Sequence, residues 1–460
     1  MAATEPTTVA PPAAHEGILR RQSLRESAAR TYARSLPIVP VRARGLTIEG
    51  ADGRRYLDCL SGAGTLALGH NHPVVLEAIR KVIDSGAPLH VLDLATPVKD
   101  AFTTELFATL PRELAEDARI QFCGPAGTDA VEAALKLVRT ATGRTGLLAF
   151  TGAYHGMTAG ALDASGGATD VRVTRLPYPH DYRCPFGIGG ERGAELSARW
   201  TENVLDDPKS GVPDPAGMIL EPVQGEGGVI PAPDTWLRRM RQITADRSIP
   251  LIADEVQTGV GRTGAFWAVE HSGVVPDVMV MSKAIGGSLP LAVIVYRSAL
   301  DLWRPGAHAG TFRGNQLAMA AGAATLTFVR ENRLAERAAT LGARMLGRLQ
   351  GLAATHPCVG DVRGRGLMLG VELVAPDADG PHDGAPPPAP ALAAAVQRAC
   401  LDRGLIVELG GRHGAVVRLL PPLTLTDEQA SAVLDRFADA LTAAQRTRHQ
   451  PLTSDTGPSR

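Results

Sequence analysis

The feature that most constrains the fold is an alternation of short apolar runs with helical patterns between about residues 70 and 325. Each run is nearly continuous in apolar character and is bounded by Gly, Pro or Asp, as is typical of strands buried on both faces. Between the runs, segments such as Thr128–Thr140 carry apolar residues at helical spacing. This alternation predicts an α/β fold with a mostly parallel sheet, in which ligands bind near the carboxyl ends of the strands. The predicted strands are Leu147–Phe150, Met218–Leu220, Leu251–Ala253, Val278–Met281 and Ala292–Tyr296.

The pattern changes after about residue 330. Amphipathic helices are predicted over Leu334–Gly351 and Asp427–Ala443, with short strand-like runs between them. These features indicate a smaller α+β domain beside the large one. The runs are Gly366–Leu373, Leu405–Glu408 and Val416–Leu419.

A chain of 460 residues is too long for one small core and suits two domains. We expect a large domain over 70–325 and a smaller one assembled from 15–69 and 326–445. Residues 1–14 and 446–460 have the composition of disordered tails. The Pro-, Gly- and Asp-rich stretch Pro376–Pro390 is predicted to be a surface loop.

Composition excludes several classes of protein. The net charge is −1, which favours neither nucleic acid nor an anionic membrane as a partner. No apolar run is long enough for a transmembrane helix, and the N-terminus lacks a signal-peptide pattern. The five cysteines are scattered without a CxxC pair, which argues against a disulfide framework and a structural zinc site. A reducing cytoplasm is the simplest expectation for the compartment, and no metal is expected.

Two predicted strands lead directly into residues that a cofactor site needs. Asp254 follows one apolar run, and Lys283 follows another by one residue. A lysine so placed can form an imine with pyridoxal 5'-phosphate (PLP), while a carboxylate keeps the pyridine nitrogen protonated. Only five of the 47 basic residues are lysines, and arginine cannot replace a neutral amine. Taken alone, Lys283 could be a solvated surface residue, and Asp254 could equally be a helix N-cap.

Two further motifs are compatible with the same cofactor. Gly127 and Thr128 open a predicted helix, whose free N–H groups and dipole suit a phosphate. Tyr154 lies between glycines after another strand and could stack on a planar ring. Each has an ordinary explanation, a helix cap for the first and a core tyrosine for the second.

Together these residues resemble the class III, PLP-dependent aminotransferases of fold type I, from about residue 35 to 440. The resemblance rests on the Asp-Glu-Val-Gln-Thr-Gly run from Asp254, on Ser282-Lys283, and on the Gly-Thr-Phe-Arg-Gly-Asn run from Gly310. It implies a large domain with a mostly parallel seven-stranded sheet, plus a smaller α+β domain. It also implies that Lys283 is the Schiff-base lysine and proton shuttle, and that Asp254 pairs with the pyridine nitrogen.

The resemblance assigns further positions around the ring. Glu221 is expected to help position the site. Val256 and Tyr154 are expected to pack on the two ring faces, and Gln257 to lie near the ring hydroxyl.

The resemblance also assigns the phosphate end. Gly127 and Thr128 are expected to bind the phosphate, although Ala126 replaces the serine that relatives often carry before the glycine. Thr311 is expected to reach the phosphate from the neighbouring subunit. This implies a homodimer with shared sites and leaves open whether dimers pair into tetramers.

The substrate end is also implied by the family pattern. Arg418, bracketed by apolar residues and Pro-Pro, matches the arginine that binds the α-carboxylate of 2-oxoglutarate or glutamate. Glu226 matches an acidic residue that pairs with this arginine when the other substrate is bound. A plain surface ion pair is the alternative for Arg418.

Within the class, the run from Leu60 to Pro73, the Cys123–Thr128 segment and the His308–Arg313 segment look like the 2,4-diaminobutyrate:2-oxoglutarate aminotransferases. The expected reaction exchanges an amino group between L-2,4-diaminobutyrate and 2-oxoglutarate, giving aspartate 4-semialdehyde and glutamate. Another ω-amine donor (ornithine, acetylornithine or 4-aminobutyrate), an aminomutase, a PLP-dependent decarboxylase and a non-catalytic PLP-binding module remain as alternatives.

Overall fold

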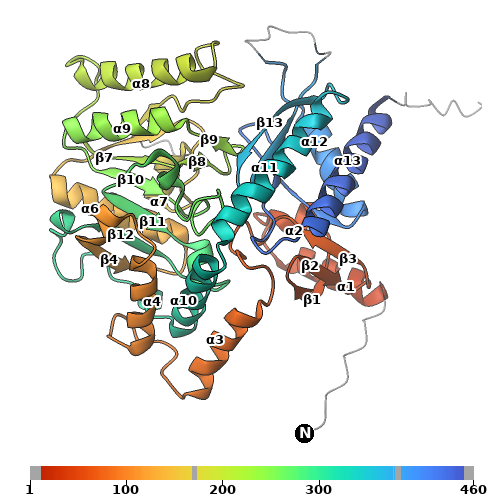
Figure 1. Cartoon of the computed structure of the whole chain (residues 1–460), viewed down its shortest axis with the longest axis horizontal. Helices are drawn as coiled ribbons and strands as arrows, with labels where there is room; N and C mark the ends of the chain where they lie inside the picture. The colour runs from red at the N-terminus through yellow and green to blue at the C-terminus, as the bar shows by residue number, and fades with distance from the viewer. Residues whose placement is uncertain (1–11, 168–172, 377, 379–384, 450–460) are drawn as a thin grey trace, which may run out of the picture.

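The computed structural model describes residues 12–167, 173–376, 378 and 385–449. The strands are numbered in chain order (Figure 1). Their bounds are β1 Pro40–Arg44, β2 Thr47–Gly50, β3 Arg55–Asp58, β4 Ala118–Phe122, β5 Gly146–Phe150, β6 Val173–Leu176, β7 Pro215–Leu220, β8 Val223–Gln224, β9 Ile230–Pro231, β10 Leu251–Asp254, β11 Val278–Met281, β12 Val293–Arg297, β13 Val359–Arg365, β14 Met368–Leu373, β15 Leu405–Ile406, β16 Glu408–Gly410 and β17 Val416–Leu419.

Helices connect and cover these strands. The α-helices are α1 Pro12–Arg25, α2 Tyr32–Ser35, α3 Pro73–Asp84, α4 Pro97–Phe107, α5 Arg112–Ala115, α6 Gly127–Thr142, α7 Ala159–Ser165, α8 Gly190–Asp206, α9 Asp234–Asp246, α10 Gln316–Glu331, α11 Leu334–Ala353, α12 Pro390–Asp402 and α13 Asp427–His449. Short 3₁₀ helices are η1 Ala268–Ser272, η2 Lys283–Gly286, η3 Ser298–Leu300 and η4 Thr311–Arg313.

The central element is a seven-stranded sheet with strand order β4-β12-β11-β10-β7-β5-β6. All neighbours are parallel except β12, which is antiparallel to both β4 and β11. Residues 282–292, which join β11 to β12, are too few for the helical crossover that a parallel pair usually needs. The predicted α/β fold with a mostly parallel sheet is therefore confirmed.

Strand β5 shows why the sheet strands are apolar on both faces. Leu147 and Ala149 pack into one hydrophobic cluster with α6, whereas Leu148 and Phe150 pack into another with α8 and α9. In Figure 1, α8 and α9 lie on one side of the sheet and α6 on the other. Because neighbouring side chains point to opposite faces, a strand between two helical layers needs an unbroken apolar run.

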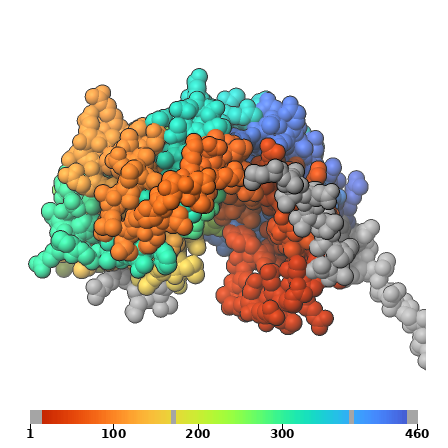
Figure 2. Space-filling model, turned by 90° about the horizontal axis from the view of Figure 1, so that it is seen from below, coloured from red at the N-terminus to blue at the C-terminus, as the bar shows by residue number. Residues whose placement is uncertain are grey.

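A smaller part of the molecule combines the two ends of the described chain. Strand β15 completes the sheet β1-β2-β3-β15 by pairing in parallel with β3, and β13-β14-β17-β16 forms a second sheet. In Figure 1 the red strands β1 to β3 lie near the blue helix α13. Seen from below, the molecule is hollowed between the red N-terminal elements and the orange and yellow segments (Figure 2).

Among the strands of the central sheet, the prediction missed β4 and β6. Both lie at the edges of the sheet and are buried only at their two ends, with polar residues such as Gln121 and Arg175 between, so they lack the continuous apolar signal. The predicted helices match α6, α11 and α13, and the predicted central strands match β5, β7, β10, β11 and β12, to within a few residues.

Three predicted segments fall partly outside the described residues. Helices α1 and α13 begin at Pro12 and end at His449, so the described residues of the two predicted tails are helical, and residues 1–11 and 450–460 lie outside the described residues. Helix α13 continues because Leu441 and Ala444 pack into the main hydrophobic cluster. Within Pro376–Pro390, the described residue Pro388 forms a β-bridge with Val374.

In the described part of the chain, no helix is both long and apolar enough to cross a bilayer.

Candidate active site

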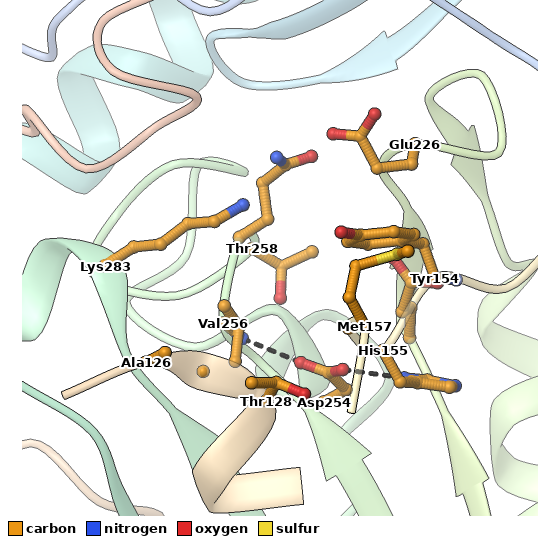
Figure 3. Close-up of a pocket in the computed structure, with 14 residues that line it drawn as sticks. Ala126, Thr128, Tyr154, His155, Met157, Glu226, Asp254, Val256, Thr258 and Lys283 are labelled. Carbon is orange, nitrogen blue, oxygen red and sulfur yellow. Dashed lines mark hydrogen bonds and ion pairs between the residues drawn. The ribbon is translucent and has the colours of Figure 1, made fainter. Parts of the chain in front are cut away.

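The carboxyl ends of β5, β7, β10 and β11 meet at a cavity of about 270 Å³, where α6 also begins (Figure 3). This is the place at which parallel α/β sheets bind ligands. The cavity is lined by Ala126, Gly127, Thr128, Tyr154, His155, Gly156, Met157, Glu221, Glu226, Asp254, Val256, Gln257, Thr258 and Lys283.

Asp254, the last residue of β10, forms a buried pair with His155. Its Oδ2 lies 2.7 Å from Nδ1 of His155, and its Oδ1 accepts a hydrogen bond from the backbone N–H of Val256 at 3.1 Å. Burial lowers the pKa of His155, but its hydrogen bond to Asp254 and the charges of Asp254 and Glu221 outweigh burial and raise it. The pair therefore holds an oriented, charge-compensated carboxylate at the floor of the cavity (Figure 3).

The adjacent acid, Glu255, points elsewhere. Its carboxylate accepts hydrogen bonds from the hydroxyl of Thr258 and, at 2.9 Å, from the backbone N–H of Val269. It is 1% exposed and does not line the cavity. Burial raises the pKa of Glu255 to about 7. Of the two consecutive acids, one faces the cavity and the other fastens the following loop.

Lys283 projects into the cavity from the turn after β11 (Figure 3). Its φ angle of 51° is in the left-handed region, which side-chain-bearing residues rarely adopt. The hydroxyl of Ser282 donates to the carbonyl of Leu291 at 2.9 Å and fixes this turn. Burial lowers the pKa of Lys283, Glu226 raises it, and Arg418 lowers it further, so the net direction is down. A lower pKa favours the neutral, nucleophilic amine.

The start of α6 forms one wall of the cavity. A Cβ atom at Gly127 would lie 3.1 Å from Cγ1 of Val256, so glycine lets the backbone approach that side chain closely. Ala126 makes no side-chain cap, and the Asp129 carboxylate accepts from its backbone N–H at 3.0 Å. The hydroxyl of Thr128 lies 2.6 Å from that of Thr158. This helix start offers an anion site.

The remaining predicted ring residues also surround the cavity. Tyr154 is 43% exposed and lies across the cavity from Val256 (Figure 3). Glu221 accepts from the backbone N–H of Tyr154 at 2.9 Å and of Gly225 at 3.0 Å, so it ties two strand ends together. Burial raises the pKa of Glu221 to about 7. Gln257 has a buried Oε1 without a hydrogen-bond partner.

Arg418 lies behind Glu226 and is 0% exposed. Its Nη2 donates to both carboxylate oxygens of Glu226 at 2.8 Å, and it forms an ion pair with Oε2 of Glu408 at 2.7 Å, although that contact is not aligned as a hydrogen bond. The other oxygen of Glu408 accepts from the hydroxyl of Tyr32 at 2.7 Å. Burial lowers the pKa of Arg418, but the two carboxylates outweigh burial and raise it.

Sequence reasoning missed roles for several residues. His155 was part of a motif without an assigned role, and Glu408 ended a predicted strand. At His155 and at Glu408 the sequence shows a polar residue in a largely apolar stretch, but it does not identify the residue with which each one pairs. Tyr32 and Met157 carry no such signal.

Two predicted residues do not line the cavity. Arg418 is covered by Glu226. Thr311 lies in η4 and is exposed.

Comparisons with known proteins agree on a family. A model described as aminotransferase class-III matches residues 28–441. A diaminobutyrate–2-oxoglutarate aminotransferase from Rhizobium meliloti (strain 1021) is 55% identical over 434 residues, covering 93% of this chain and 92% of the relative. A protein of the same name from Haemophilus influenzae is 47% identical over 440 residues, covering 94% of this chain and 96% of the relative.

A solved structure extends this agreement to the fold. An amine transaminase from an uncultivated Pseudomonas species, in PLP-bound form, is 29% identical with a TM-score of 0.81, covering 91% of this chain and 97% of that one. Because the family model spans most of the sequence, the chain belongs to the class III aminotransferases.

Proposed function

We propose that this chain is a PLP-dependent ω-aminotransferase that exchanges an amino group between L-2,4-diaminobutyrate and 2-oxoglutarate, giving aspartate 4-semialdehyde and glutamate. The observation that carries the proposal is that Lys283, Asp254 and Glu226 line the same cavity, with Arg418 directly behind Glu226. The names of the relatives at 55% and 47% identity support the choice of substrates.

The residues of the cavity fit PLP. Lys283 would hold the cofactor covalently, and Asp254 would hold the pyridine nitrogen. The start of α6 at Gly127 offers free N–H groups to the phosphate. The unpartnered Oε1 of Gln257 is a buried acceptor that a donor such as the ring hydroxyl would satisfy.

When bound, PLP supplies an electron sink that stabilises negative charge on the substrate carbon that loses its proton. The Nζ atom of Lys283, once released, takes that proton and later delivers it as a general acid. Its lowered pKa favours the free amine that this step needs. The hydrogen bond with His155 fixes the direction of the Asp254 carboxylate.

Arg418 is the residue that we assign to the carboxylate of glutamate or 2-oxoglutarate. Its Nε and Nη1 atoms are buried without hydrogen-bond partners, which is costly unless a ligand supplies acceptors. A planar guanidinium matches a carboxylate with two parallel hydrogen bonds. Glu226, whose side chain is 31% exposed, would move aside to admit it.

Turnover with a panel of amines tests this function. Purified protein with PLP and 2-oxoglutarate should form glutamate in equal amount to the diaminobutyrate consumed. Ornithine, N-acetylornithine and 4-aminobutyrate are the comparison donors. Turnover of one of these with none of diaminobutyrate would refute the substrate, and reaction without 2-oxoglutarate consumption would indicate an aminomutase.

We also propose that Thr311 serves the site of a second copy of the chain. Large apolar side chains near Thr311 are exposed in the single chain, which is unusual outside an interface. The segments are held together by a β-bridge between His90 and Asn315. The exposed side chains are Leu89, Leu92, Leu94 and Phe312.

Analytical ultracentrifugation and PLP titration test the dimer. We expect a dimer whose dissociation constant for PLP rises when Thr311 is replaced by valine. The conservative Thr311→Ser variant should retain affinity. A fully active monomer would contradict this proposal.

A further inference from the structure

We propose that Glu408 is a positioning residue that biases the substrate end of the cavity toward a donor carrying a second ammonium group. This inference rests on the proposed function, because it concerns how diaminobutyrate is distinguished from related substrates. The argument begins with the charges around one buried guanidinium.

Arg418 lies between two carboxylates. Glu226 contacts Nη2 with both oxygens at 2.8 Å, and Glu408 approaches the same nitrogen at 2.7 Å. One positive and two negative charges leave this cluster with a formal surplus of one negative charge. A second carboxylate on an arginine that is already paired is not needed to neutralise it.

The two glutamates differ in freedom. The side chain of Glu226 is 31% exposed and lines the cavity, whereas that of Glu408 is 7% exposed and does not. Glu408 on β16 lies directly opposite Arg418 on β17 in the antiparallel pairing. Its second oxygen is held by the hydroxyl of Tyr32 at 2.7 Å. Glu226 can therefore leave Arg418, while Glu408 stays.

This asymmetry affects the two substrates in opposite ways. When a dicarboxylate displaces Glu226, the fixed negative charge of Glu408 repels the dicarboxylate. This repulsion weakens the binding of the dicarboxylate to Arg418. When a diamino donor enters, Glu226 stays paired with Arg418. Because Glu408 also compensates Arg418, the exposed side of the Glu226 carboxylate keeps surplus negative charge for the ammonium at C2. Diaminobutyrate differs from 4-aminobutyrate by that ammonium alone, and a carboxylate pair with surplus negative charge would recognise it.

The test is Glu408→Gln, which keeps the size of the side chain and removes its charge. Relative to the unaltered enzyme, kcat/KM for diaminobutyrate should fall about tenfold, while kcat/KM for glutamate should rise or hold. The inhibition constant of glutarate, an unreactive dicarboxylate, should fall as well. Discrimination between diaminobutyrate and 4-aminobutyrate should shrink.

Tyr32→Phe is the matched control, because it removes a hydrogen bond to Glu408 but no charge. It should shift the diaminobutyrate and glutamate reactions in the same direction. If Glu408→Gln also lowers both reactions equally and leaves glutarate binding weaker, its role is structural and the inference is overturned. If the unaltered enzyme does not use diaminobutyrate at all, it is the proposed function that fails, and this result is read before any variant is made.

Discussion

The two ends of the cavity are built in different ways. At the cofactor end, Asp254 and Lys283 follow neighbouring parallel strands of one sheet, and each is preceded by an apolar run. At the substrate end, Arg418 receives Glu226 from the loop after β8 and Glu408 from β16, which is tied to Tyr32 of α2. One end is a product of a single sheet, and the other is assembled from three distant parts of the chain.

The difference also concerns charge. At the cofactor end the carboxylate of Asp254 is matched by a histidine partner, whereas at the substrate end two carboxylates share one guanidinium. A carboxylate with a histidine partner suits the end of the cavity that holds a cofactor, because the cofactor stays in place through both half-reactions. An end with a surplus charge and a movable side chain suits two substrates of different charge that alternate in one site.

The largest expected effect is that of Lys283→Ala. Removing the amine removes both covalent attachment of the cofactor and proton transfer, so both half-reactions should slow by about 10³-fold or more. Single-turnover absorbance measurements check this. Borohydride trapping followed by peptide mapping should label Lys283 in the unaltered protein, and the exposed Lys209→Ala variant should behave normally. Labelling of another lysine would break the assignment.

Asp254→Asn should slow both half-reactions about equally, by roughly 100-fold. The amide cannot compensate a protonated pyridine nitrogen, and it removes the carboxylate that contacts His155. Rapid-mixing kinetics with diaminobutyrate and with glutamate measure the two rates, and PLP titration measures cofactor affinity. A defect confined to one substrate would show that Asp254 belongs to the substrate end instead.

Arg418→Met should separate the two half-reactions. Loss of the guanidinium should weaken glutamate and 2-oxoglutarate about 100-fold, while the diaminobutyrate half-reaction changes much less. Because two carboxylates are left without a cation, thermal denaturation must show that the variant is folded. Arg418→Lys keeps the positive charge but cannot donate two parallel hydrogen bonds to a carboxylate, so it should recover part of the glutamate activity. Equal losses in both half-reactions would contradict a substrate-specific role.

Glu255→Gln should affect catalysis least and stability in a pH-dependent way. Burial raises the folded-state pKa of Glu255 to about 7, above the ordinary 4.5, so the unfolded chain releases this proton at lower pH. The contribution of Glu255 to the free energy of unfolding is therefore fully present below about pH 4.5, and it is lost as the pH rises through about 7.

Glutamine cannot ionise, so between pH 5 and 8 the variant should lose less unfolding free energy than the unaltered protein, by up to about 3 kcal/mol. Urea denaturation at several pH values measures this, and Glu221, with a similar pKa, accounts for part of the remaining slope. Parallel curves for the two proteins would show that Glu255 is already ionised at pH 5.

The sequence by itself determined strands β5, β7, β10, β11 and β12 of the central sheet and the cofactor end, because strands buried on both faces need apolar runs and their carboxyl ends carry the ligands. The sequence singled out Asp254, but only the structure shows what Glu255 does, because its direction depends on the backbone turn after β10 and on the partner Val269.

Only the tertiary structure decided the substrate end. Tyr32 and Glu408 are 376 positions apart, and Arg418 and Glu226 are 192 apart, so no local pattern links them. They meet because β15 pairs with β3 and β16 with β17, which brings both ends of the described chain to one cavity. A polar residue in an apolar strand signals a buried partner, but the identity of that partner depends on long-range packing.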